Sequence, residues 1–573
     1  MVDSLKNKSL LVLSSLLLSV LAFIIVIIGG FYFSNKGFEM SDETFYLHFT
    51  QNIDYSVYLT QNFGILNKLA CFGNISLINL RIAKLIYQLI AILIFSYSLL
   101  NYFKSKKIVL SSCHQLLIII ILCMSSFVNY DYLPMALSYN TWTLILGLLG
   151  FSIILIELTK TTAKAQLVGS FSMGFVVFGL FLVKFPNAII MFAIYCFVNL
   201  FYNKNNWGIR SIAFFTGIVF SFFILLHNMN SLLQIIENYK AVLFDIKYIS
   251  PNSYFIQLIN FWNICVNMGY IKWMLGVILL TALIYRFNAR KNVLLNYLPI
   301  FINCAVSCFF FKGNSQNLYN DFLVMMILIM NVIIYIQFNK DKFSKAVVFS
   351  EMNLIALFLM ITPVLLMIGT NNLFYYTTSQ TCCFCFAGLI IFIVKTKKMD
   401  SFFIPLMSVI VCAFVLSVIY HGAIKTPYRQ NNLLDKKFPI HFHPSIDGIY
   451  ESYDRFVDYT ALNILVNKLN SKHKEVVTSF NYIGLCYISN TKFSPKSPIS
   501  DADYLVEANK YILNRDKFNN SAELLVFPSN IHNSTAFKNM FKLYGINLGT
   551  NYKLVYSYTF LSTNEIVFFY KKV

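Results

Sequence analysis

A short acidic cluster follows the first long apolar segment of the chain. Glu39, Asp42 and Glu43 stand close together, although the 573 residues include only 25 Asp and Glu. Carboxylates near a membrane are costly unless they pair with cations or perform chemistry. A carboxylate there can serve as a general base. We therefore predict Asp42 and Glu43 as catalytic residues, and the alternative is that they are solvated loop carboxylates.

Several basic residues stand at the ends of apolar segments, where they could bind a phosphate group. Arg81 begins the second apolar segment, and Lys84 lies one helical turn further along the same face. Lys184 and Lys312 each stand in a stretch that is otherwise apolar, and Arg429 follows the last apolar segment. Such cations stabilise charge on a leaving phosphate. Each could instead extend its charge to lipid head groups.

A metal site is a further option near the acidic cluster. Asp42, Asp131 and His48 are the candidate ligands, and their oxygen-rich set would suit Mg²⁺ or Mn²⁺. A single loop histidine is more often not a ligand. We therefore assign no certain cofactor and keep a divalent metal as the open possibility.

The elements that must position these residues are membrane helices. Hydrophobic residues make up 57% of the chain and charged residues 12%, whereas soluble proteins carry roughly 25% charged residues. The apolar runs predict about thirteen spans of a bilayer core that is roughly 30 Å thick. They lie near residues 9–33, 79–103, 109–128, 139–158, 166–183, 186–202, 209–228, 270–286, 293–311, 320–338, 347–369, 377–395 and 402–420.

Basic residues in alternate connections predict the orientation. Lys104 to Lys107 and Lys395 to Lys398 are examples, and such clusters are typical of cytoplasmic loops. The basic connections fall on the same side of the membrane throughout the chain only if one span ends and the next begins near Pro186. It predicts that external loops cover about 34–78 and 229–269, and that the tail is external. We expect a multi-pass protein of the bacterial inner membrane; two glycosylation sequons, at Asn74 and Asn533, leave the endoplasmic reticulum open.

The net charge of +20 does not point to nucleic acid. Much of the excess lies beside membrane spans, where anionic lipids explain it, so we expect membrane lipids and no nucleic acid as partners. Most of the cysteines lie inside predicted spans as small packing residues. One disulfide among Cys71, Cys265 and Cys486 is conceivable.

The polar tail has the pattern of a small α/β domain. Helical patterns lie near 452–470, 500–516 and 532–543, and strand-like runs lie at 475–480, 523–527, 554–559 and 565–570. We therefore expect residues 1–424 to form a mainly helical transmembrane domain and residues 425–573 to form an external α/β domain. In the first loop, apolar residues at positions 59, 63, 66 and 69 predict an amphipathic helix on the membrane surface.

Two motifs of the first loop resemble a known superfamily. They are Ser41-Asp42-Glu43-Thr44-Phe45-Tyr46 and the segment from Phe72-Gly73 to Arg81. Together with the many spans and the external tail, they resemble the GT-C integral membrane glycosyltransferases, which include protein O-mannosyltransferases and the aminoarabinose transferases of lipid A. The motifs cover only about residues 38–85.

The resemblance implies transfer of a sugar from a polyprenyl-phosphate-linked donor to a lipid, glycan or protein acceptor outside the cytoplasm. It implies that Asp42 is the base, or a metal ligand that orients the acceptor, and that the basic residues named above hold the donor phosphate. A transporter or flippase of lipid-linked saccharides is the alternative from another class. An O-antigen polymerase or ligase is a third, although those enzymes favour a large basic loop between late spans.

Overall fold

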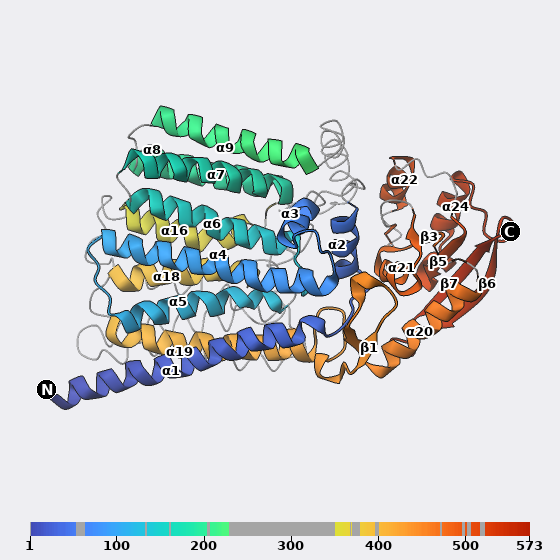
Figure 1. Cartoon of the computed structure of the whole chain (residues 1–573), viewed down its shortest axis with the longest axis horizontal. Coiled ribbons are helices and arrows are strands. Elements are labelled where there is room, and N and C mark those ends of the chain that lie inside the picture. Colours follow the sequence, from blue (N-terminus) through green and yellow to red (C-terminus); the bar gives the residue numbers. More distant parts are fainter. Residues whose placement is uncertain are drawn as a thin grey trace, which may run out of the picture.

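A bundle of long helices forms one part of the molecule, and a domain with a β-sheet lies at one end of it (Figure 1). The computed structural model describes residues 2–52, 63–131, 134–159, 162–202, 207–228, 350–366, 368, 379–395, 400–469, 471, 473–494, 499–500, 506–515 and 522–573. Within these ranges, eight helices are long and apolar enough to cross a membrane. The chain is therefore a multi-pass membrane protein.

The helices of the bundle follow the apolar runs of the sequence. Their bounds are α1 (Val2–Tyr32), α4 (Leu77–Ser105), α5 (Ser112–Ser126), α6 (Tyr139–Thr159), α7 (Ala163–Val183), α8 (Phe185–Tyr202), α9 (Trp207–Asn228) and α19 (Asp400–Val418). Two shorter apolar helices are α16 (Glu351–Leu365) and α18 (Cys383–Lys395). The spans expected near 270–286, 293–311 and 320–338 and the loop at 229–269 lie outside the described residues, so the total of thirteen stays a prediction.

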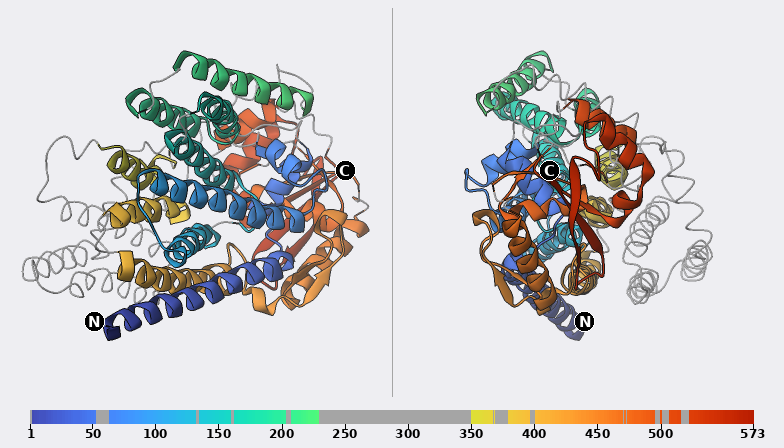
Figure 2. Two further views of the ribbon diagram at one scale, coloured as in Figure 1. Left: turned by 60° about the vertical axis from the view of Figure 1, so that its left-hand side comes forward. Right: turned by 90° about the vertical axis from the view of Figure 1, so that its right-hand side faces the viewer.

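Neighbouring helices pack along their lengths around one apolar core. α1 packs on α19 and α5, α4 on α5 and α6, and α7 on α6, α8 and α9. Figure 2 shows the same bundle from two further sides, with α1 along its edge. Many Leu and Ile side chains of α1 remain exposed, as expected for a helix that faces lipid.

Two details of the bundle bear on the topology. The chain breaks at Lys184, between α7 and α8, two residues before the Pro186 at which the charge alternation predicts that two spans meet. Arg210 lies inside α9. Its guanidinium is buried and forms an ion pair with Glu157 of α6, because a charge inside a bundle needs a partner.

The first loop begins where α1 ends. A 3₁₀ turn, η1 (Phe33–Asn35), leads to α2 (Asp42–Gln51), and α3 (Phe63–Ala70) follows. The start expected for the amphipathic helix, at position 59, lies outside the described residues. Phe63 and Ile65 of α3 are buried against the bundle while Leu69 is exposed, so α3 is the described part of that helix.

The tail folds as an α/β domain. Its main sheet has the order β4-β3-β5-β7-β6, in which β3 pairs in parallel with β4 and β5, and β7 pairs antiparallel with β5 and β6. The bounds are β3 (Glu475–Thr478), β4 (Lys492–Phe493), β5 (Leu524–Pro528), β6 (Tyr552–Thr559) and β7 (Ile566–Lys572). The helices are α20 (Tyr453–Lys468), α21 (Gly484–Ser489), α22 (Val506–Arg515), α23 (Ser529–Asn533) and α24 (Thr535–Leu543).

Helices cover both faces of this sheet because alternate strand residues point to opposite sides. Val476 and Val526 belong to the core that includes α20, whereas Val477 and Phe527 pack with residues of α24. All five residues of β5 are buried, as befits a strand in the middle of a covered sheet.

The first loop is attached to this domain through its backbone. A small hairpin of β1 (Phe438–Ile440) and β2 (Ile449–Glu451) lies against residues 36–38, and the Gly37 amide donates to the Tyr450 carbonyl at 2.8 Å. The Phe38 amide donates to the Glu451 carboxylate, which also pairs with Lys436. Neither side chain of that ion pair is exposed. Residues 36–38 are therefore bound by the tail.

Candidate active site

The acidic cluster lies at the start of α2, and Glu39 sets its geometry. The Glu39 carboxylate accepts hydrogen bonds from the amide of Ser41 at 2.9 Å and from the amide of Glu43 at 2.8 Å. It thereby satisfies backbone donors that have no partner in the first turn of a helix. Asp42 is the first residue of α2, where the helix dipole favours a negative charge.

Glu43 points into the bundle and is fully buried. Arg81 of α4 binds both of its carboxylate oxygens, and the Ala136 amide donates to Oε1 at 2.9 Å. Arg81 also donates to the carbonyls of Ser34, Lys36 and Gly37. Since its donors already have these acceptors, the geometry favours Arg81 and Glu43 as a pair that positions the loop, rather than as a phosphate ligand and a base.

Asp42 points elsewhere and meets the tail. The Tyr428 hydroxyl donates to its Oδ2 at 2.5 Å, and the Arg429 guanidinium lies 3.5 Å from the same oxygen. Arg429 also donates to the Ser41 hydroxyl at 2.5 Å. Its backbone φ of 52° is in the left-handed region that residues other than glycine rarely adopt, and such strain clusters at functional sites. Asp42 and Arg429, two of the expected site residues, are thus brought together.

The surroundings shift the pKa values of Asp42 and Glu39. Burial raises the pKa of Asp42, while the Arg429 charge and the Tyr428 hydrogen bond oppose that rise. Burial, followed by repulsion from Asp42, raises the pKa of Glu39 to about 7. A raised pKa makes the Asp42 carboxylate a stronger base than an ordinary aspartate, and its 19% exposure leaves it accessible.

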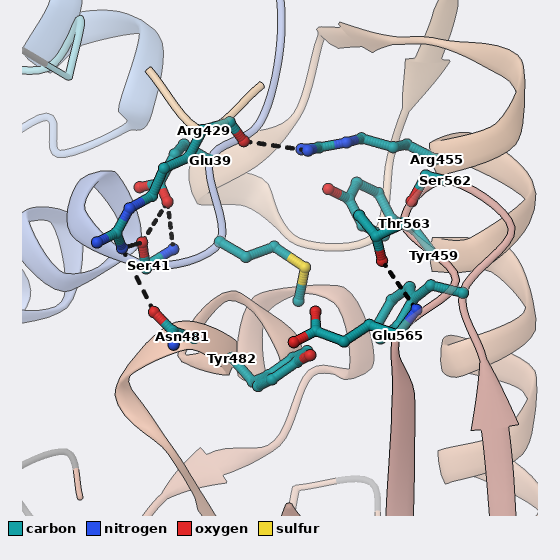
Figure 3. A pocket seen from close by; sticks show the side chains of 12 residues that line it. Glu39, Ser41, Arg429, Arg455, Tyr459, Asn481, Tyr482, Ser562, Thr563 and Glu565 are labelled. Carbon is teal, nitrogen blue, oxygen red and sulfur yellow. Dashed lines mark hydrogen bonds between the residues drawn. The ribbon is translucent and has the colours of Figure 1, made fainter. Parts of the chain in front are cut away.

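A polar cavity of about 220 Å³ opens beside this cluster, between the first loop and the tail domain. In Figure 3, Glu39, Ser41 and Arg429 lie on one side of it, and Thr563 and Glu565 lie on the other. Hydroxyl, carboxylate, amide and guanidinium groups are the partners that hydroxyl-rich ligands need. The full lining comprises Glu39, Met40, Ser41, Arg429, Arg455, Tyr459, Asn481, Tyr482, Phe560, Ser562, Thr563 and Glu565.

Lys184 lies near a pair of aromatic rings, one of which belongs to α2. Tyr46 lies one turn after Asp42 on α2, and its ring meets that of Tyr139 at a centroid distance of 6.3 Å. The Lys184 ammonium lies 5.0 Å from the Tyr139 ring and donates to Asn140 at 2.7 Å. An ammonium has three donors. Because the described residues supply one acceptor to it, this cation can still bind a phosphate.

The remaining basic candidates differ in their surroundings. Lys84 is fully buried, donates to the Pro134 carbonyl at 3.0 Å and lies 4.1 Å from the Tyr130 ring. Lys312 lies outside the described residues.

The expected metal ligands do not come together. His48 is buried beside the rings of Phe49 and Phe493, and burial lowers its pKa to about 4. Asp131 packs against Gly422, where an added Cβ would lie 1.5 Å from Oδ1. In the described part of the chain, His, Cys, Asp and Glu side chains form no group of three or more that could hold a metal. The residues present thus do not fit the expected metal, and no chemical step is assigned to one.

Sequence reasoning missed Tyr428, Tyr46 and the residues that hold the loop. Tyrosine occurs 36 times in the chain, so the presence of a tyrosine does not by itself single out a site residue. Tyr428 is also 386 residues away from Asp42. Its position directly before Arg429, just after the last span, was the usable clue. Cys71 and Cys486 are both free, so they do not form the disulfide considered above.

No protein-family model matches the chain, and no curated protein matches it in sequence. Solved structures do resemble it. An oligosaccharyltransferase from Archaeoglobus fulgidus, in complex with zinc and sulfate, is 13% identical with a TM-score of 0.41 and covers 98% of this chain and 73% of its own. ArnT from Cupriavidus metallidurans, bound to undecaprenyl phosphate, is 9% identical with a TM-score of 0.38 and covers 96% of this chain and 97% of its own.

One neighbour is thus an oligosaccharyltransferase and the other is ArnT. With TM-scores below 0.5, however, neither neighbour assigns an activity or a ligand to this chain.

Proposed function

We propose that the chain is a membrane glycosyltransferase that moves a sugar from a polyprenyl-phosphate carrier to an acceptor outside the cytoplasm. The observation that supports it most is the placement of Asp42. The Asp42 carboxylate is partly exposed at the end of the membrane bundle, and its partner Arg429 lines the polar cavity, while the buried Lys184 lies near the Tyr139 ring within the bundle. A lipid-linked sugar requires this combination, because its carrier lies in the membrane while its sugar needs polar partners.

Asp42 is the general base in this proposal. Among the described residues, Tyr428 and Arg429 both contact Oδ2, so Oδ1 is left for an acceptor hydroxyl. As the acceptor oxygen bonds to the anomeric carbon, its proton passes to Asp42. The bond between that carbon and the phosphate oxygen breaks, and its electron pair stays on the carrier phosphate. Lys184 stabilises the charge that develops there.

The test is a transfer assay with purified full-length protein in vesicles. The donor is a labelled sugar on a polyprenyl phosphate, and lipid, glycan and peptide acceptors are offered separately. We expect covalent transfer of the label to one of them, and we expect Asp42→Asn to reduce turnover by about 10²–10⁴-fold, the usual contribution of a general base. The variant keeps the shape of the side chain and its acceptor for Tyr428.

Glu43→Gln is the matched comparison on the neighbouring residue. It leaves Arg81 buried without its counter-ion, which costs about 3–5 kcal/mol, so we expect lower thermal stability as its main effect. Normal turnover in Asp42→Asn would contradict the assignment of the base. Movement of the intact lipid-linked sugar across the vesicle, without cleavage, would favour a flippase instead.

A further inference from the structure

The polar cavity lies at the carboxyl edge of the parallel strands of the tail. Asn481 and Tyr482 follow the end of β3, and the turn at residues 560–565 reaches the same edge, because β7 begins where β5 ends. The connection after β3 leads to β4 on one side of the sheet, whereas the chain after β5 leads to β6 on the other. Ligands of α/β sheets bind outside the carboxyl ends of strands, where the connections diverge. The cavity is therefore placed where this type of domain binds a ligand.

The Glu565 carboxylate brings a negative charge without a counter-ion to this cavity. In Figure 3 it points into the cavity from the turn between β6 and β7, while the Glu565 amide donates to the Thr563 hydroxyl at 3.4 Å. Within the described residues, no cation forms an ion pair with this carboxylate. An ionised carboxylate accepts hydrogen bonds and donates none. A ligand of the cavity must therefore offer a donor to Glu565.

The Arg455 guanidinium lines the cavity from α20 and has the opposite charge. It donates to the carbonyls of Phe38 at 3.3 Å and Arg429 at 3.1 Å. In the part of the chain that the structure describes, no carboxylate forms an ion pair with Arg455, whereas Arg429 already pairs with Asp42. A guanidinium has five donors and no acceptor. Arg455 therefore keeps donors for an acceptor atom of the ligand.

These two charges limit the chemistry of the ligand. A ligand carboxylate would bind Arg455 and be repelled by Glu565, and a ligand ammonium would meet the reverse. A hydroxyl group both donates and accepts, so a neutral polyol can bind the two residues at once. The rings of Tyr482 and Phe560 are stacked with centroids 5.9 Å apart and line the same cavity. They offer an apolar surface to the C–H groups of a sugar ring.

The size and the borders of the cavity narrow the ligand further. Its volume of about 220 Å³ lies below the roughly 300–1,000 Å³ of pockets that enclose drug-sized ligands, so it holds one sugar ring rather than an oligosaccharide. A peptide that added itself to the sheet would need an unpaired strand edge. The strand ends beside the cavity, Thr559 and Ile566, pair with each other.

We propose that this cavity binds one uncharged sugar residue of the acceptor, and that Glu565 is the residue that excludes anionic acceptors. The inference rests on the proposed function and narrows its acceptor from a lipid, glycan or protein to a saccharide. Ser41 and Arg429 line the cavity and are the sequence neighbour and the ion-pair partner of Asp42. A sugar in the cavity therefore lies beside the proposed base.

The test is a binding measurement on the full-length protein in lipid nanodiscs, without any donor, by saturation-transfer NMR. The neutral probes are methyl glucoside and methyl galactoside, and their charged counterparts are methyl glucuronide and methyl glucosaminide. N-acetylglycinamide represents a peptide. We expect the neutral glycosides to bind, each charged glycoside to bind about tenfold more weakly because it meets a like charge, and the amide not to compete.

Substitutions of Glu565 test its role in specificity. Glu565→Gln keeps the shape and an acceptor oxygen but loses the charge, so the affinity for neutral glycosides should fall about fivefold. Glu565→Lys reverses the charge and should make the glucuronide bind more tightly than the glucoside. Glu507→Gln is the matched control at an exposed carboxylate of α22 outside the cavity lining, and it should change neither affinity.

Three outcomes would overturn the inference: tighter binding of a charged glycoside than of the neutral ones, unchanged affinities in Glu565→Gln, and competition by the amide. None of these readouts contains a transfer step. Transfer to an acceptor without any binding of neutral glycosides would therefore overturn this inference alone. Binding of the glycosides without transfer to any acceptor would overturn the proposed function alone.

Discussion

Two adjacent carboxylates have opposite surroundings in this chain. Glu43 is buried and bound by Arg81, whereas Asp42 keeps partial exposure and is bound by Tyr428 and Arg429. In a helix, neighbouring side chains point about 100° apart, so one can face the bundle while the other faces the tail. We infer that the Glu43 carboxylate supports the loop and that the Asp42 carboxylate does the chemistry.

The hydrogen bond from Tyr428 makes the pH dependence of the reaction a test. A donor to the charged carboxylate favours that form and opposes the rise in the pKa of Asp42 that burial causes. Tyr428→Phe removes the donor, so the pKa of Asp42 rises further and the base is protonated at higher pH. We expect the acidic limb of kcat/KM to move to higher pH, with activity on that limb reduced on the order of tenfold. An unmoved limb would count against Asp42 as the titrating base.

Lys184 gives a prediction about substrate binding. Lys184→Ala removes a buried cation that the described residues supply with a single hydrogen-bond acceptor. Because the ammonium is assigned to the carrier phosphate, we expect a higher KM for the donor, by about tenfold, and little change for the acceptor. Lys184→Arg keeps the charge and should recover part of the donor affinity. An equal loss of affinity for both substrates would indicate general damage to the site.

Residue types and spacing allowed Asp42 to be predicted because acidic residues are rare in this chain. They did not reveal that Glu43 and Arg81 pair, although both were singled out, since 38 positions separate them and no local pattern connects them. Nor did they reveal Tyr428, whose role arises only when the tail folds back onto the first loop.

At the scale of elements, the hairpin of β1 and β2 fixes the position of the acidic cluster. The Lys436–Glu451 pair lies without exposure at the end of the hairpin where β1 begins and β2 ends, and Glu451 also binds the backbone of residue 38. Removing one partner of a buried ion pair leaves an uncompensated charge, at a cost of about 3–5 kcal/mol. This pair therefore connects the stability of the tail to the geometry of the site.

Lys436→Met tests that connection, with Lys437→Met as the matched control. Lys437 is the next residue and is exposed, so its loss removes a charge without opening the core. We expect Lys436→Met to lower the temperature of thermal unfolding and to reduce transfer, and Lys437→Met to do neither. If Lys436→Met unfolded earlier yet transferred sugar at the normal rate, the hairpin would not position the site.

Periodic patterns predicted most of the elements. The strand-like runs near 475, 523, 554 and 565 became β3, β5, β6 and β7, because runs rich in β-branched, aromatic and other apolar residues favour strands. The strands β1, β2 and β4 have only two or three residues each, too few for a period to show. β1 and β2 lie against the first loop, and β4 lies at the edge of the main sheet. The sequence was therefore least informative about the hairpin that holds the acidic cluster.

At the scale of the whole molecule, orientation in the membrane is the prediction that matters most. Alternate basic connections predict a cytoplasmic turn between α4 and α5 and an external tail. Val109 in that turn is 92% exposed, and Leu543 in the tail is 70% exposed, so a cysteine at either position is accessible to a reagent.

We expect a membrane-impermeant maleimide to label Leu543→Cys in intact cells and to label Val109→Cys only after the membrane is opened. The unchanged protein gives the background from its native cysteines. Labelling in the reverse order would place the acidic cluster in the cytosol and remove the basis for an external acceptor.

The contact between Tyr428 and Asp42 spans 386 positions of the chain. A ribosome makes the acidic loop early and the residues that complete it only after the eight described helices that can cross a bilayer. In the proposed reaction, Asp42 therefore lacks its Tyr428 and Arg429 partners until the last of these helices has been made. The proposed site is complete only when the tail has emerged and folded onto the loop.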